Sequence, residues 1–195
     1  MNSAEGDSWK KKMTPPARGS VQLQDLTWRE LAAQLNDYPV ILLPIGAIEA
    51  HGPHLPLDTD VLIAQELARR AACSLNELGT PALVAPAIHY SVSFVGGDFP
   101  GTLPVTSDAL VMYLLDVLQA LGRLEPVAIV VVNAHLEPAH VAALHIAIEA
   151  AQPSCEASIL FPDIREQPWS RMLSDEFWSG RRHAGAYETS LLLAA

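Results

Sequence analysis

Acidic and histidine side chains gather in three short segments that lie far apart along the sequence. The residues are Glu49, His51 and Asp60, then His135 and Glu137, then His183 and Glu188. Carboxylate oxygens and imidazole nitrogens together are ligands that zinc, manganese and iron accept in proteins. A glutamate and a histidine stand two residues apart in each of the first two segments, so one member of each pair can serve each of two ions. The pattern predicts a pair of divalent ions that share a bridging carboxylate.

Other histidines and acids of the sequence have plainer explanations than metal binding. We interpret four histidines as surface or core residues: His54, His89, His140 and His145. Asp58 is equally suited to capping the helix expected after it and to binding a metal. Two strand ends that each carry a glutamate and a histidine are harder to explain without a cation, because burial would leave like charges and polar atoms unpaired.

The elements that must position these side chains are helices and apolar strands in alternation. Strands are expected at residues 39–46, 81–88, 125–135 and 155–161. Helices are expected at residues 26–38, 60–78, 106–122, 137–151 and 184–195. Strands that are apolar almost throughout predict a three-layer α/β/α fold with a mostly parallel sheet. The first two acid and histidine pairs follow strands directly, so we expect them at the carboxyl edge of the sheet, where open α/β sheets bind ligands.

The composition is that of a compact domain that binds neither nucleic acid nor a membrane. Half of the 195 residues are hydrophobic, and we expect a disordered tail over residues 1–20 and a single domain over residues 21–195. The net charge of -10 disfavours phosphate binding, and no apolar run approaches the about 20 residues of a membrane span. Two distant cysteines and a tail without a signal-peptide core favour a cytoplasmic location. Since the sequence ends inside an apolar helical pattern, we expect a short docked helix or a C-terminal truncation.

Four segments of the sequence, taken in order, resemble the signature blocks of the creatininase (creatinine amidohydrolase) family. They are LPIGAIEAHGPHLPLDTD, FPGTLPV, VVNAHLEPAH and HAGAYETS. The resemblance runs from about Leu26 to the C-terminus, and its first block is the most specific. It implies a creatininase-like fold, with the family's metal positions taken by Glu49, His51, Asp60 and His135. Many members read NGHGGN at the third block, whereas Glu137 in NAHLEP is similar to the creatininase branch itself and completes the second metal site there.

The resemblance also implies a mechanism, a cofactor and an assembly. Asp60 bridges two ions, which are zinc or manganese, and iron is also compatible. Glu49 and His135 complete the site of one ion. His51 and Glu137 complete the site of the other ion. A hydroxide shared by both ions attacks the carbonyl of a small cyclic amide, a creatinine-like lactam. His183 protonates the departing nitrogen, and Glu188 either orients a ligand or His183 or is a plain acid at a helix N-terminus. Family members are homo-oligomers, commonly hexamers.

Other functions remain open at the level of the sequence. Within the same family they are deamination of an amino-muconate type compound, deformylation of a formamide and trimming of a peptide. NAHLE favours lactam hydrolysis over the last two but does not exclude deamination. A non-enzymatic alternative is a truncated, metal-binding assembly partner. Trp169 and Trp178, which lie before His183, suit either a core role or a lid over a flat substrate.

Overall fold

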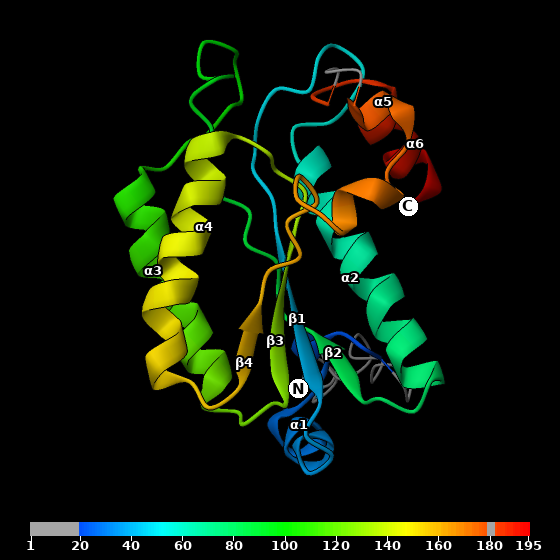
Figure 1. Ribbon diagram of the computed structural model, residues 1–195, viewed down its shortest axis with the longest axis vertical. Coiled ribbons are helices and arrows are strands. Elements are labelled where there is room, and N and C mark those ends of the chain that lie inside the picture. Colours follow the sequence, from blue (N-terminus) through cyan, green and yellow to red (C-terminus); the bar gives the residue numbers. More distant parts are fainter. Residues whose placement is uncertain (1–19, 179–181) are drawn as a thin grey trace, which may run out of the picture.

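The fold is built on a four-stranded parallel sheet, seen in a computed structural model that describes residues 20–178 and 182–195 (Figure 1). The strands are β1 (Val40–Ile45), β2 (Ala82–Val84), β3 (Ala128–Asn133) and β4 (Ser158–Leu160). Their order in the sheet is β2-β1-β3-β4. The expected N-terminal tail lies, except for Ser20, outside the described residues.

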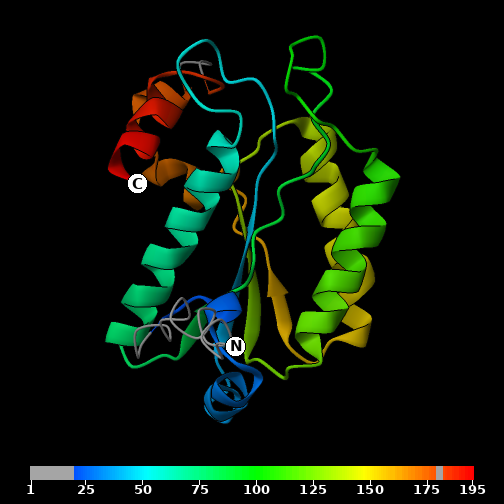
Figure 2. The ribbon, with the colours of Figure 1, turned by 180° about the vertical axis from the view of Figure 1, so that it is seen from behind.

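Helices cover both faces of this sheet, which gives the three layers that the sequence predicts (Figures 1 and 2). The helices are α1 (Trp28–Leu35), α2 (Thr59–Glu77), α3 (Ser107–Gly122), α4 (Pro138–Ala151), α5 (Asp175–Trp178) and α6 (Ala186–Ala194). Helix α2 lies on one face with α5 and α6 near its N-terminal half, while α3 and α4 lie together on the other face. Among the described helices, none combines the length and apolarity needed to cross a membrane.

Alternate side chains of the strands supply two apolar layers. Ile41 and Leu43 of β1 are buried in the cluster shared with α3 and α4, together with Leu144 of α4. Leu42 points to the opposite face and packs with Ala68 of α2. This period of two explains why the strand is apolar at every position, since both of its faces are covered.

The strand order places a natural crevice above β1 and β3. The chain leaves β1 through α2 to reach β2 on one side, and then crosses through α3 to β3 on the other side of β1. The loops after β1 and β3 therefore diverge to opposite faces, and open α/β sheets bind ligands at such a switch point. The register pairs Ile45 of β1 with Asn133 of β3, so the two loops begin at the same level along the strand direction.

Some predicted boundaries were wrong. The strand expected at residues 81–88 is shorter, since β2 ends at Val84 and only an isolated bridge between Ile45 and Ile88 follows. Residues 89–105 are irregular, as expected. The expected irregular segment 162–185 contains a 3-10 helix, Trp169–Met172, and α5, because the wholly buried Phe177 anchors this segment to the core.

Gly46 ends β1 at a point where the backbone of α2 passes very close. A Cβ atom added at Gly46 would lie 2.4 Å from the amide nitrogen of Val61 and 2.7 Å from the carbonyl carbon of Asp60. We expect Gly46→Ala to lower the free energy of unfolding by about 1–3 kcal/mol, because a rigid backbone must move to admit the methyl group. Urea unfolding measures this loss.

Gly96→Ala is the matched control for that substitution. Its added Cβ would meet nothing closer than 3.5 Å, which is an ordinary contact. We expect its free energy of unfolding to stay within about 0.5 kcal/mol of the unchanged chain. Equal stability of the two variants would contradict the close approach of β1 and α2.

Candidate metal centre

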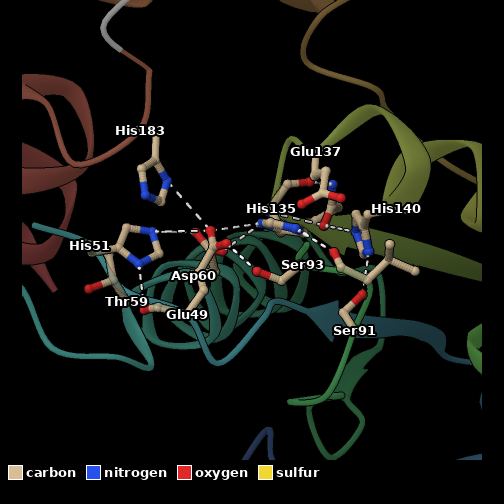
Figure 3. Close-up of polar contacts among 12 residues, drawn as sticks. Glu49, His51, Thr59, Asp60, Ser91, Ser93, His135, Glu137, His140 and His183 are labelled. Carbon is tan, nitrogen blue, oxygen red and sulfur yellow. Dashed lines mark hydrogen bonds and ion pairs between the residues drawn. The ribbon is translucent and has the colours of Figure 1, made fainter. Parts of the chain in front are cut away.

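The acid and histidine residues predicted from the sequence meet at the carboxyl ends of β1 and β3. Glu49 and His51 follow β1, Asp60 lies in the first turn of α2, and His135 follows β3 (Figure 3). The loop between β1 and α2 folds back on itself, because the Glu49 amide donates to the Leu57 carbonyl at 2.9 Å. This return brings Asp60 to face the end of the strand that precedes it.

Asp60 lies between two imidazoles. Its Oδ1 is 3.2 Å from Nε2 of His51, and its Oδ2 is 2.9 Å from Nδ1 of His135. Glu49 Oε1 is 3.1 Å from the same nitrogen of His135. All four side chains are buried. The carboxylate of Asp60 thus contacts both histidines, one through each oxygen, whereas Glu49 Oε1 is close to His135 and lies 3.8 Å from Nε2 of His51.

Each histidine at the site has one ring nitrogen fixed by a backbone carbonyl. His51 Nδ1 donates to Glu49 O at 3.1 Å, and His135 Nε2 donates to Val92 O at 2.8 Å. His183 Nε2 donates to Ala50 O at 2.9 Å. Metal-binding histidines are oriented in this way, since the bonded N–H fixes the tautomer and leaves the other nitrogen unprotonated for the ion.

In the protein without a cation, protons on the imidazoles balance the buried carboxylates. Burial opposes a charge on His51, but the hydrogen bond and the charge of Asp60 raise its pKa to about 9. Burial likewise opposes a charge on His135, and Asp60 and Glu49 raise its pKa to about 10. These imidazoles hold the pKa of Asp60 well below its usual range despite its burial.

Two further observations indicate that the residues of the site are suited to binding a metal ion. Asp60 Oδ2 is buried and accepts no directed hydrogen bond, although His135 is near, so it has a lone pair to offer. Glu49, His135 and Glu137 each present a ligand atom within 4.8 Å of one another, and so do His51, Asp60 and Glu188. Oxygen and imidazole donors at this spacing suit zinc, manganese or iron.

The two remaining glutamates belong to different candidate ligand groups. Glu137 lies beside His135 on the same loop, where its two oxygens accept from the amides of Phe94 and Val95 at 3.3 Å each. Glu188, in the first turn of α6, is buried 3.7 Å from His51. The ligand atoms of Glu188 therefore group with those of His51 and Asp60, and those of Glu137 with His135 and Glu49. Burial and the charge of Asp60 raise the pKa of Glu188 to about 7.

His183 stands at the mouth of a cavity over these residues. Its Nδ1 is 3.5 Å from Glu49 Oε1, its ring centroid is 4.4 Å from that of His51, and its side chain is 54% exposed. The cavity has a volume of about 410 Å³, and Val95, Phe99 and Arg182 line it beside the acids and histidines. A small substrate can therefore touch both His183 and the buried carboxylates.

Several side chains outside the predicted set also shape the site. Ser93 donates to the second oxygen of Glu49, and no local pattern in the segment 89–105 marks it. Asp58 makes no capping hydrogen bond, and it joins none of the candidate ligand groups of the described chain. Among the described residues, the lining of the cavity includes neither Trp169 nor Trp178. The structure therefore gives no support to a tryptophan lid.

The chain is similar in sequence to several known proteins. A family profile described as Creatinine amidohydrolase matches residues 24–195. A creatinine amidohydrolase of Pseudomonas putida is 28% identical over 186 residues, which cover 90% of this chain and 72% of that protein. A mycofactocin precursor peptide peptidase of Mycobacterium tuberculosis is 35% identical over 163 residues, which cover 80% of this chain. The chain spans only 58% of the length of that peptidase.

Solved structures extend these similarities to the fold. The structure named Creatininase Mn has a TM-score of 0.75 at 27% identity, and the match covers 90% of this chain and 73% of that one. A creatininase mutant of the Zn-Zn type has a TM-score of 0.72 at 28% identity, over 90% of this chain and 72% of that one. The α/β fold predicted from the sequence is confirmed by these neighbours and by the parallel sheet.

Asp60 is the residue whose loss should affect both ligand sets. We expect Asp60→Asn to retain less than about one ion per chain where the unchanged chain retains a pair, because metal ligands must be deprotonated anions or neutral bases. Elemental analysis after dialysis against zinc or manganese measures this. Asp58→Asn, two residues earlier, is the control and should retain the full metal content. A pair of ions on Asp60→Asn would contradict the shared role of Asp60.

Proposed function

The chain belongs to the creatininase family, and from this premise we propose that it is a metal-dependent amidohydrolase that cleaves a C–N bond of a small amide. The proposal rests on Asp60, which is buried between His51 and His135 and lies directly beside Glu49 and His135 of the cavity lining. A carboxylate shared by two histidine and glutamate sets is the arrangement that a pair of hydrolytic ions requires.

The ligand sets divide according to the contacts seen in the structure. We assign Glu49, His135 and Glu137 to one ion, His51 and Glu188 to the other, and Asp60 to both. Similarity to creatininases with zinc and with manganese supports these two metals, and iron suits the same ligands. A pair of such ions would polarise an amide carbonyl and lower the pKa of a bound water toward neutrality.

His183 is the residue that we assign to proton transfer. Its Nε2–H donates a hydrogen bond to Ala50 O at 2.9 Å, so its Nδ1 faces Glu49 and the cavity. In this neutral tautomer Nδ1 can take a proton from the attacking water and return it to the departing nitrogen. The ring packs against His51, which restricts its rotation.

The cavity supports a small, flat substrate. A volume of about 410 Å³ lies at the lower end of the range of pockets that enclose small molecules. Val95 and Phe99 of the lining offer apolar contacts, and Glu49, Glu137 and Glu188 of the same lining offer carboxylates. A cyclic amide such as a creatinine-like lactam is the substrate class that we propose. The homo-oligomer that the family resemblance implies, commonly a hexamer, also stays a proposal.

A second candidate is hydrolysis of a peptide bond. It is favoured by the 35% identity to a mycofactocin precursor peptide peptidase and by Arg182 in the cavity lining. The Arg182 Nε donates to Phe177 O at 2.9 Å, and its guanidinium lies 4.5 Å from the centre of the Phe177 ring. An arginine held in this way can pair with a carboxylate, and every unmodified peptide ends in one.

A substrate screen on the metal-loaded protein tests the proposal. The panel holds cyclic amides and ureas, amino-dienoates, N-formyl amides, and short peptides with free or amidated ends. The readout is the ring-opened or cleaved product, separated by chromatography and identified by its mass. We expect hydrolysis of cyclic amides that is lost in the dialysed apo-protein and restored by zinc or manganese. Cleavage of free-acid peptides alone would replace the lactam by the peptide candidate. A pair of bound ions without any hydrolysis would favour the non-enzymatic assembly partner.

Replacing His183 should separate catalysis from metal binding. We expect His183→Ala to lower turnover of the substrate found in the screen by about 10²–10⁴-fold, the usual contribution of a positioned general acid. Its metal content should match that of the unchanged chain, because Glu49, Asp60 and His51 all remain. The exposed His89, replaced by Ala, is the control and should leave turnover unaltered. Unaltered turnover in His183→Ala would remove its catalytic role.

A further inference from the structure

A second buried polar chain lies directly behind His135. Its members are Ser91, His140 and Asn133, which come from the loop after β2, the first turn of α4 and the end of β3. Figure 3 labels Ser91 and His140 beside His135. His140 Nδ1 is hydrogen-bonded to Ser91 Oγ, and His140 Nε2 is 2.9 Å from Asn133 Oδ1. All three side chains are buried. A polar group in such a place costs free energy unless it is hydrogen-bonded, so each bond of the chain matters.

Asn133 connects His140 to the backbone of His135. The Asn133 Nδ2 donates to His135 O at 2.6 Å, and its Oδ1 accepts from His135 N at 3.1 Å. These two bonds fix which end of the amide is oxygen. His140 must therefore donate through Nε2, which leaves Nδ1 to accept the hydroxyl proton of Ser91. Every donor in this network has one acceptor, so the rings and the amide have one orientation.

Ser91 connects His140 to the other side of His135. The residue after Ser91 is Val92, whose carbonyl accepts from His135 Nε2 at 2.8 Å. His140 thus holds His135 from both sides, through Asn133 at its backbone and through the Ser91–Val92 segment at its ring. The two rings are also in edge contact, with centroids 4.8 Å apart at 62°.

We propose that His140 is a positioning residue for the metal centre, and that it sets the direction in which His135 Nδ1 points at Asp60 and Glu49. This inference rests on the proposed function, since it concerns the ion that Glu49 and His135 would hold. An apolar side chain of similar size would fill the space of His140, but it would leave Asn133 Oδ1 without this donor and the Ser91 hydroxyl without this acceptor. The Ser91 hydroxyl would then be free to turn, and Asn133 would keep only its two bonds to the His135 backbone, so His135 would be held less firmly.

Metal binding by purified apo-protein tests this role without any substrate. Zn²⁺ affinity is measured against a chromophoric chelator, and Co²⁺ is added separately to record its visible absorption bands, which report ligand geometry. We expect His140→Leu to bind Zn²⁺ about 10–100-fold more weakly, as is usual when a group that orients a ligand is lost. The Co²⁺ bands should shift or lose intensity.

A conservative variant and a control on the same helix separate positioning from packing. In His140→Gln the side-chain amide can still donate to Asn133, so we expect Zn²⁺ affinity within a few fold of the unchanged chain and its Co²⁺ spectrum. His145→Leu, at an exposed position of α4, should change neither. Should His140→Leu fail to fold, Ser91→Ala carries the test, with about tenfold weaker Zn²⁺ binding expected.

Failure of the role proposed for His140 can be distinguished from failure of the proposed function. Unchanged Zn²⁺ affinity and an unchanged Co²⁺ spectrum in His140→Leu, or in Ser91→Ala where leucine prevents folding, would overturn the role of His140 and leave the proposed function intact. Loss of affinity in His140→Gln equal to that in His140→Leu would assign the effect to packing and also overturn it. An unchanged chain that binds no metal would remove the proposed function, and this inference with it.

Discussion

The buried carboxylate of Asp60 is the group on which the rest of the site depends. It faces His51 on one side and His135 on the other, and all three side chains are buried. Such a charge is stable in the interior only with close positive partners, which are imidazolium protons in the apo-protein and would be cations in the loaded protein. The backbone carbonyls of Glu49 and Val92 fix the two rings, so their other nitrogens point at Asp60.

The sheet makes this concentration of charge possible. The register of β1 and β3 starts two loops at one height, and the close approach at Gly46 brings the first turn of α2 against the end of β1. Asp60 therefore reaches the site from a helix while His135 reaches it from a loop. The apolar layers beneath, with Leu43 of β1 buried against Leu144 of α4, hold these backbones in place. The loops that carry the buried ligands are thus anchored close to strand ends, whereas the side chain of His183 is 54% exposed.

The sequence predicted the parts of the site that follow from strand ends. Glu49, His51 and His135 follow apolar strands, so a parallel sheet had to bring them to one edge, and Asp60 could be placed by the loop that returns to the next helix. The proximity of Glu188 to His51 was not predictable, because it depends on how α6 packs against α2. The same holds for His140, which looks like an ordinary core histidine until Ser91 and Asn133 are found beside it. Contacts between segments that are distant in the sequence leave no sequence pattern near either residue, so they could not be predicted.

Anomalous diffraction from crystals of the zinc-loaded protein tests most directly whether Asp60 bridges a pair of ions. We expect two peaks, one on either side of the Asp60 carboxylate, with His135 bound to the first through Nδ1 and His51 to the second through Nε2. Glu188 should contact the second ion. A single peak, or peaks that do not contact Asp60, would show that Asp60 is not a bridging ligand.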